Sequence, residues 1–299
     1  MSNVQGEKLQ KILARGGFGS RRSVETIIAE GKVKVNGRTA KLGDRALETD
    51  QIKVNDQLVK STRLAKQPTQ VILYNKPEGK ICSRSDEKGR ETIYQQMPRI
   101  INGRWVSIGR LDMNTSGLMI LTNNGELANR LAHPSFEIER EYMVRVFGEV
   151  ADDVIKQLKK GVMLDDGLAK FDKISRLKSD DESMNNWFRV TISEGRNREV
   201  RRMWESQGVQ VSRLQRVRYG QFQLPRQLRK GKTEPLTWKQ INQLLASVDL
   251  PEEARPDLRT NVSTKKQPLK NSRSGQRAID GKRKTIHDLS GGRKKRGRR

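Results

Sequence analysis

Few side chains in this sequence could perform covalent chemistry, and their types narrow the possible reactions. The chain holds one cysteine, Cys82, and two histidines, His133 and His287. This set excludes disulfide scaffolds and multi-cysteine metal sites, and the wide spacing of the histidines argues against a Ser/His/Asp or Cys/His relay. No glycine-rich dinucleotide loop follows a strand pattern, and no Walker sequence is present. Any catalysis should therefore use carboxylate, arginine, lysine or tyrosine side chains.

One loop combines a carboxylate with a basic residue and two hydroxyls. Residues 109–117 read Gly-Arg-Leu-Asp-Met-Asn-Thr-Ser-Gly. The loop lies between a predicted strand that ends near Ile108 and a hydrophobic strand that begins at Leu118. Two rigid strands would hold Asp112 at the surface of a sheet. Taken by itself, a loop aspartate is far more often a turn or capping residue than a catalytic one.

Strand and helix patterns alternate around this loop. Short hydrophobic runs predict strands, and apolar residues three and four apart predict helices. The predicted strands cover residues 71–75, 105–108, 118–122, 141–147, 187–193 and 211–217, and the predicted helices cover 125–132, 152–160, 197–207 and 238–246. Strands outnumber helices, and turns join several of them. We therefore expect an α+β fold with a largely antiparallel mixed sheet and flanking helices.

The N-terminal residues form a separate pattern of two short helices followed by hairpins. Ser20 can cap the second helix, and Asn36-Gly37 is a strong hairpin signal. Arg21 and Arg22 would lie at the start of the second helix, where exposed backbone N–H groups suit a phosphate. Residues 61–69 are polar and aperiodic, and we interpret them as a linker.

Positive charge is concentrated at the two ends of the chain. The sequence carries 61 Lys+Arg against 35 Asp+Glu, a formal net charge of +26. Residues 1–66 contribute +7 and residues 251–299 contribute +11 of this charge. The imbalance favours nucleic acid as the partner, ahead of an anionic membrane surface. Residues 251–299 lack aromatic side chains, which predicts a disordered polybasic tail. No apolar run is long enough for a transmembrane helix or a signal peptide.

Several motifs resemble those of RNA pseudouridine synthases of the RsuA-like group. The stretch from Lys8-Leu-Gln-Lys-Ile-Leu-Ala-Arg through Ser20-Arg-Arg to Gly31-Lys-Val-Lys-Val-Asn-Gly resembles an S4 RNA-binding domain. Four later segments resemble the synthase motifs in order: Tyr74-Asn-Lys-Pro-Glu-Gly, Gly109-Arg-Leu-Asp-x-x-Thr-x-Gly-Leu, Arg140-Glu-Tyr and Glu194-Gly-Arg-Asn-Arg-Glu-Val-Arg-Arg-Met-Trp. The resemblance extends from residue 7 to about residue 245.

The resemblance implies a role for each matching residue. Asp112 would be the catalytic carboxylate, Tyr142 would contact the target base, and Arg201 would pair with Asp112 and lower its pKa, by about 1 to 3 units for a neighbouring guanidinium. Further substrate contacts would come from Arg110, Thr115, Lys76, Arg198 and Arg202. In the S4-like domain the RNA contacts would be Arg21, Arg22, Lys32 and Lys34.

Conversion of uridine to pseudouridine is an isomerisation without redox change or external nucleophile, so no cofactor and no metal are expected. The carboxylate could form an adduct at C1′, stabilise an oxocarbenium-like centre or remove the C2′ proton. The sequence leaves these three roles open.

We therefore predict an S4-like domain at residues 1–66, a linker at 61–69, a catalytic domain at 70–250 and a tail at 251–299. The Arg198-Glu-Val-Arg-Arg-Met-Trp-Glu stretch, residues 209–220 and the basic extension look most like those of enzymes that modify 23S rRNA near the peptidyl transferase region. The substrate would be naked RNA or a large-subunit assembly intermediate. We expect a monomeric, cytoplasmic enzyme without a membrane partner. The alternatives are a 16S rRNA enzyme of the same family, a noncatalytic ribosome-assembly factor and an S4-containing RNA methyltransferase.

Overall fold

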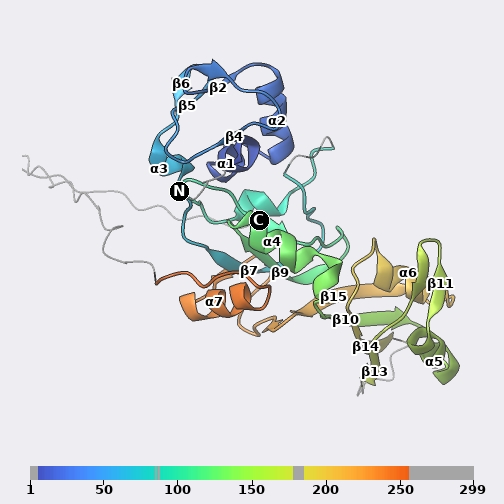
Figure 1. The fold of residues 1–299 in the computed structure, drawn as a ribbon. Coiled ribbons are helices and arrows are strands. Elements are labelled where there is room, and N and C mark those ends of the chain that lie inside the picture. Colours follow the sequence, from blue (N-terminus) through green and yellow to red (C-terminus); the bar gives the residue numbers. More distant parts are fainter. Residues whose placement is uncertain (1–5, 85, 87, 178–184, 256–299) are drawn as a thin grey trace, which may run out of the picture. The chain divides into compact units, whose positions relative to one another are not determined.

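The computed structural model describes residues 6–84, 86, 88–177 and 185–255 (Figure 1). Its N-terminal elements are β1 (Glu7–Lys8), α1 (Leu9–Arg15), α2 (Arg21–Ala29), β2 (Val33–Val35), β3 (Arg38–Thr39), β4 (Arg45–Ala46), β5 (Ile52–Val54), β6 (Gln57–Leu58) and α3 (Ser61–Leu64). Within the described residues, four of the strands pair in the order β3-β2-β5-β6, and β1 pairs with β4. Their apolar side chains form one core together with those of the helices.

Local signals in the sequence account for most of these N-terminal elements. The Ser20 hydroxyl accepts a hydrogen bond from the Ser23 backbone N–H at 3.0 Å, which confirms the predicted helix cap. Asn36 and Gly37 both have positive φ angles between β2 and β3, as the hairpin signal requires. The linker prediction is wrong for residues 61–64, which form α3. The Leu64 side chain is fully buried in the N-terminal core, and a single helical turn is too short to show periodicity.

The larger sheet confirms the predicted α+β class. Its strands are β7 (Val71–Lys76), β8 (Val106–Ile108), β9 (Ser116–Thr122), β10 (Arg140–Phe147), β13 (Lys173–Leu177), β14 (Asn185–Ile192), β15 (Val211–Tyr219), β16 (Phe222–Gln223) and β17 (Thr233–Pro235). In the described part of the chain the order is β13-β14-β10-β15-β9-β7-β17, with β8 beside β9 and β16 beside β15. Of these pairings, β9 with β15 is parallel and the others are antiparallel.

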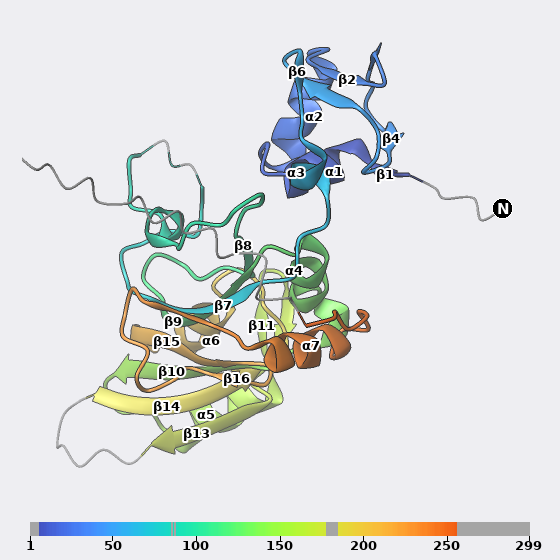
Figure 2. The same ribbon diagram turned by 90° about the vertical axis from the view of Figure 1, so that its left-hand side faces the viewer.

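Helices cover this sheet in two separate groups (Figure 2). The side chains of α4 (Gly125–Ala132) and α7 (Trp238–Ala246) pack with those of β7 and β9 in one apolar cluster. The side chains of α5 (Asp152–Lys160) and α6 (Glu199–Glu205) pack with β10, β14 and β15 in another. Predictions for α4, α5 and α7 agree with the structure residue for residue. Helix α6 is shorter than predicted, because Arg198 has a left-handed backbone with φ 48° just before it.

Several short elements lack a sequence signal strong enough to predict them. These are the 3-10 turns η1 (Ile93–Gln96) and η2 (Pro134–Phe136), the hairpin of β11 (Val162–Leu164) and β12 (Gly167–Ala169), and strands β13, β16 and β17. Most span two to five residues, too few to display a period. No helix in the described ranges is both long enough and apolar enough to cross a membrane.

The predicted tail begins too early. The Glu253 carboxylate accepts hydrogen bonds from the backbone N–H and the hydroxyl of Thr69, at 2.7 and 2.6 Å. The Glu253 carbonyl accepts bonds from the side chains of Trp238 and Asn242. Glu253 is therefore bonded to the segment just before β7 and to α7. The rest of the predicted tail, residues 256–299, lies outside the described residues.

Candidate active site

A cavity of about 1230 Å³ lies between the loop after β8, the strands β10 and β15, and the segment that leads into α6. Of the residues expected at the site, the cavity is lined by Asp112, Tyr142, Arg110, Thr115 and Arg198. These side chains come from segments far apart in sequence, and the fold brings them together around one space. The size of the cavity is sufficient for a nucleotide, since small-molecule pockets typically measure about 300 to 1,000 Å³.

The Asp112 loop is anchored at both ends by strands. Strand β8 ends at Ile108, strand β9 begins at Ser116, and a turn in between is closed by a hydrogen bond from the Thr115 N–H to the Asp112 carbonyl at 3.1 Å. The Asp112 side chain is partly exposed to the cavity. Within the described residues, no side chain forms an ion pair or hydrogen bond with its carboxylate. The carboxylate is therefore available to a bound substrate.

Lys76 supports the Asp112 loop through hydrogen bonds to backbone carbonyls. Its side chain is fully buried at the end of β7. The ammonium group donates to the carbonyls of Pro77, Asp112 and Thr115 at 2.9 to 3.0 Å, and it lies 3.4 Å from the Met113 carbonyl. Burial lowers the pKa of Lys76, and the nearby Asp112 carboxylate opposes that shift. Lys76 is absent from the cavity lining and contacts the backbone of the Asp112 loop, so a substrate contact by Lys76 stays a prediction.

Gly117 fixes the distance between the Asp112 loop and β15. Its φ angle is +106°, and an added Cβ atom would lie 2.2 Å from the Arg216 carbonyl oxygen. Only glycine permits this close parallel pairing of β9 with β15 at Gly117 and Arg216. The glycine of the Gly109–Gly117 loop motif is thus required by backbone packing.

A β-bulge shapes the floor of the cavity. Tyr142 on β10 lies opposite Arg216 on β15, while Arg140 lies opposite Tyr219, because the register shifts by one residue between these pairs. Arg216 and Tyr219 are three residues apart, so in a regular strand they would point to opposite faces of the sheet. The extra residue at the bulge, Val217, places them on the same face, and the side chains of Arg140, Tyr142, Arg216 and Tyr219 all line the cavity. Tyr142 is buried here, on the wall that a flat base could stack against.

Arg201 does not form the expected ion pair with Asp112 among the described residues. Its side chain is buried, and its guanidinium donates to the Val211 carbonyl at 3.0 Å and to the Asn114 carbonyl at 2.9 Å. Burial lowers the pKa of Arg201, while the Asp112 carboxylate acts in the opposite direction. Arg201 therefore supports the backbone of the Asp112 loop, and its positive charge reaches the carboxylate through space.

The two other arginines of α6 and its approach differ from each other. Arg198 is exposed, lines the cavity and lies 3.5 Å from the Glu205 carboxylate. Arg202 makes a bidentate ion pair with Asp166, in the β11–β12 turn, at 2.7 and 2.9 Å. It is not part of the cavity lining. The structure therefore places Arg198, and not Arg202, where a substrate could contact it.

Sequence reasoning gave no site role to several charged or aromatic residues of the lining, among them Arg140, Arg216, Tyr219 and Glu199. Arg140 and Arg216 are buried although both are charged. A charged residue at an inward position of an otherwise hydrophobic strand is the signal that could have indicated them. Because a bulge interrupts the alternation in β15, inspection of the sequence could not show that Arg216 faces inward.

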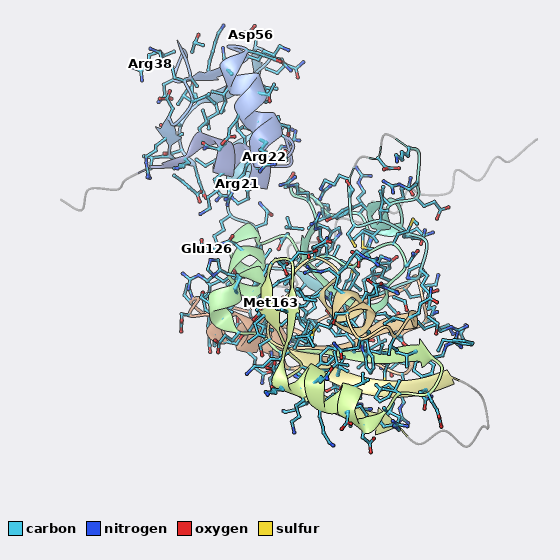
Figure 3. The ribbon with its side chains drawn as sticks, turned by 90° about the vertical axis from the view of Figure 1, so that its right-hand side faces the viewer. Arg21, Arg22, Arg38, Asp56, Glu126 and Met163 are labelled. Atoms are coloured by element: carbon cyan, nitrogen blue, oxygen red, sulfur yellow. The ribbon has the colours of Figure 1, made fainter. Side chains whose placement is uncertain are left out.

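In the N-terminal part, Arg21 and Arg22 are exposed at the start of α2 (Figure 3). Neither forms an ion pair within the described residues. Lys32 pairs with Glu30 and Lys34 pairs with Asp56, both at 2.7 Å. All four cations are at the surface, so an RNA contact by each stays a prediction. No described group of three or more His, Cys, Asp or Glu side chains is arranged to hold a metal ion.

Comparison with known proteins agrees with this geometry. A family model for RNA pseudouridylate synthase matches residues 70–206, and a model for the S4 domain matches residues 7–52. The chain is 49% identical to ribosomal large subunit pseudouridine synthase B of Haemophilus influenzae, over 91% of this chain and 75% of the relative. It is 47% identical to the protein of the same name from Escherichia coli (strain K12), over 98% of each.

A solved structure shows the same likeness. It is a crystal structure of a pseudouridylate synthase that is 30% identical to this chain, with a TM-score of 0.55. The match covers 79% of this chain and 98% of that one.

Proposed function

Because the chain belongs to the RNA pseudouridine synthase family, with relatives named ribosomal large subunit pseudouridine synthase B, we propose that it converts one uridine of 23S rRNA to pseudouridine. The target lies near the peptidyl transferase region, and Asp112 is the catalytic carboxylate. With rRNA as its substrate, the reaction takes place in the cytoplasm.

One observation carries this proposal: Asp112 and Tyr142 line the same cavity, and no described side chain occupies the Asp112 carboxylate. A uridine extruded from the RNA would place its base against the Tyr142 ring and its ribose near the carboxylate. The C1′–N1 bond then breaks, the uracil rotates, and a C5–C1′ bond forms. The C5 hydrogen leaves as a proton and N1 gains one, so the product has the composition of the substrate.

The charge around the cavity suits an RNA substrate. Arg110 and Arg198 are exposed in the lining, and Lys170 and Arg196 belong to it as well. Side chains of this kind neutralise phosphates and steer a polyanion towards the site. Extrusion of the uridine costs a few kcal/mol, and it is easiest in an unpaired or bulged segment of rRNA.

The test is to incubate the wild type and Asp112→Asn with unmodified 23S rRNA, 16S rRNA and large-subunit assembly particles. Pseudouridine is then mapped by chemical derivatisation and primer extension. We expect one modified uridine in 23S rRNA, made by the wild type and absent with Asp112→Asn, while both proteins bind the RNA within a few-fold of each other. Modification by Asp112→Asn would refute the role of Asp112. A single modified uridine in 16S rRNA would identify 16S rRNA as the substrate in place of 23S rRNA. Binding to all three RNA samples without any product would favour a noncatalytic assembly factor.

A further inference from the structure

The register of the sheet puts one arginine between the two sides of the site. Arg216 lies opposite Tyr142 on one edge of β15 and beside Gly117 on the other. Because position 117 has no side chain, the two backbones approach closely there, and the Arg216 side chain lines the cavity together with Asp112. Arg216 is therefore adjacent both to the wall that faces the base and to the loop that carries the carboxylate.

The Arg216 guanidinium is buried without a counter-charge. Its side chain is 2% exposed, and its Nε donates to the Leu118 carbonyl at 2.8 Å. Its Nη2 is buried with no hydrogen-bond partner, and no carboxylate in the described residues forms an ion pair with it. A buried cation left in this state carries a desolvation penalty of several kcal/mol unless an anion or acceptor compensates it.

Arg140 provides a comparison on the same floor. The two guanidinium carbons lie 5.2 and 5.0 Å from the centroid of one ring, that of Tyr219, which holds both groups by cation–π contact. The Arg140 Nη1 donates to the carbonyls of Ile138, Ser193 and Glu194, and its Nη2 donates to the Tyr219 hydroxyl. Both terminal nitrogens of Arg140 are thus engaged within the protein, whereas neither terminal nitrogen of Arg216 has a hydrogen-bond partner among the described residues.

We infer that Arg216 binds a phosphate of the target nucleotide and so positions the ribose over Asp112. This inference rests on the proposed function and adds a residue role to it. The phosphate is the fixed anion of an extruded nucleotide, and a guanidinium matches its geometry with parallel N–H donors. Arg216 is a positioning residue in this arrangement, since it holds the nucleotide and does not touch the reacting atoms. A displacement of about 1 Å in such a contact can reduce the rate by about 100-fold.

The experiment pairs a protein variant with a neutralised phosphate. A synthetic RNA that spans the target uridine is prepared with a charge-free methylphosphonate at the phosphate on either side of that uridine. Single-turnover rates at saturating and subsaturating RNA are measured for the wild type, Arg216→Gln and Arg218→Gln. Arg218 is the matched control, because it is two residues along the same strand, pairs with Glu139 and Glu141, and is absent from the cavity lining.

We expect one of the two methylphosphonates to slow the wild type and Arg218→Gln by at least about 10-fold, which corresponds to about 1.4 kcal/mol. The same substitution should slow Arg216→Gln by no more than about 2-fold, because the partner of the phosphate is already missing. Equal slowing of all three proteins by each methylphosphonate would overturn the inference.

Two controls separate other causes of failure. If Arg216→Gln does not fold, Arg216→Lys keeps the positive charge and removes the paired donors, and it should show a reduced sensitivity to the same methylphosphonate. Full sensitivity of Arg216→Lys would count against paired recognition of the phosphate. An inactive wild type on unmodified RNA refutes the proposed function itself, whereas an active wild type without coupling refutes the role of Arg216 alone.

Discussion

The residues that hold the Asp112 loop in place bind its backbone and leave the Asp112 carboxylate without a partner among the described side chains. Lys76 and Arg201 donate to backbone carbonyls of the 112–115 loop, and neither spends a hydrogen bond on the carboxylate itself. A buried ammonium or guanidinium is stable in such positions only because several carbonyl oxygens surround it. At the scale of residues, Lys76 and Arg201 therefore stabilise the backbone of the Asp112 loop.

Replacing Lys76 by methionine should disorganise this loop. The variant leaves the carbonyls of Pro77, Asp112 and Thr115 without their donor, at about 1 to 3 kcal/mol for each buried group left unpaired. We expect a large loss of kcat and a lower free energy of unfolding, measured by single-turnover kinetics and urea denaturation. Lys80→Met is the control, because Lys80 pairs with the exposed carboxylate of Glu91. A Lys76→Met enzyme with unchanged kcat would contradict the positioning role.

The raised pKa of Glu199 should make the free energy of unfolding depend on pH. Burial raises the pKa of this cavity-lining carboxyl, and Glu194 acts in the same direction, whereas the Arg196 N–H and the charges of Arg196 and Arg202 oppose it. The native state therefore keeps the Glu199 proton to a higher pH than the unfolded chain does. This contribution to stability is complete below the unfolded pKa of about 4.3 and is lost as pH rises through the native pKa.

Glu199→Gln cannot ionise, so its free energy of unfolding should rise relative to that of the wild type as the pH increases above the unfolded pKa of about 4.3. Urea titrations at several pH values measure this difference. Glu205→Gln serves as the reference on the same helix, because Glu205 is exposed. A Glu199→Gln difference from the wild type that varies with pH no more than the Glu205→Gln difference would disprove the effect.

At the scale of elements, the site depends on two features of strand pairing. The parallel contact of β9 with β15 sets the position of the Asp112 loop, and the bulge at Val217 turns Arg216 and Tyr219 towards the cavity. Each feature joins strands that are distant in sequence. Small changes of backbone at these two points should therefore alter catalysis more than changes elsewhere on the strands.

Gly117→Ala tests the first feature. The added methyl group would lie 2.2 Å from the Arg216 carbonyl, so the two strands must separate. We expect a loss of at least about 2 kcal/mol in unfolding free energy, together with a larger loss of activity. Gly109→Ala is the control, since Gly109 also has a positive φ of 72° but has no atom near its added Cβ. Its penalty should be about 1 to 2 kcal/mol. Equal effects of the two variants would show that the close approach is unimportant.

At the scale of the whole molecule, positive charge at the ends of the chain should govern RNA affinity. Deletion of residues 257–299 removes 15 basic and 3 acidic side chains and leaves Glu252, Glu253 and Arg255 in place. Fewer phosphates are then neutralised, so the affinity should fall and its dependence on salt should flatten. The rate at saturating RNA should be unchanged. Filter binding from 50 to 300 mM salt measures the slope, and an unchanged slope would exclude a role for these residues.

A longer deletion, of residues 251–299, gives a comparison at nearly the same charge. It also removes Glu253 and its hydrogen bonds to Thr69, Trp238 and Asn242. We expect this variant to share the flattened salt dependence and to unfold at a lower denaturant concentration. Equal stability of the two deletions would show that the Glu253 contacts contribute little.

Local patterns were sufficient for most elements, for the fold class and for the Asp112 loop. Helices such as 125–132 and 238–246 repeat apolar residues over two turns or more, and the loop motif is contiguous, so both can be recognised without knowledge of distant residues. The short hairpin of β11 and β12 and the helical turn at 61–64 hold too few residues to show a period. Their burial comes from contacts that a local pattern does not record.

Tertiary structure alone decided which residues surround the carboxylate. The family resemblance implies that Arg201 pairs with Asp112, yet the Arg201 donors reach the carbonyls of Val211 and Asn114. It also gave no indication that Arg216 faces the cavity, because that orientation depends on a one-residue register shift between β10 and β15. Strand register is set by pairing across the whole sheet, and a shift of one residue reverses the face to which a side chain points. A contiguous motif was therefore sufficient to identify the candidate catalytic carboxylate. The side chains that surround it are positioned by contacts between segments far apart in the chain.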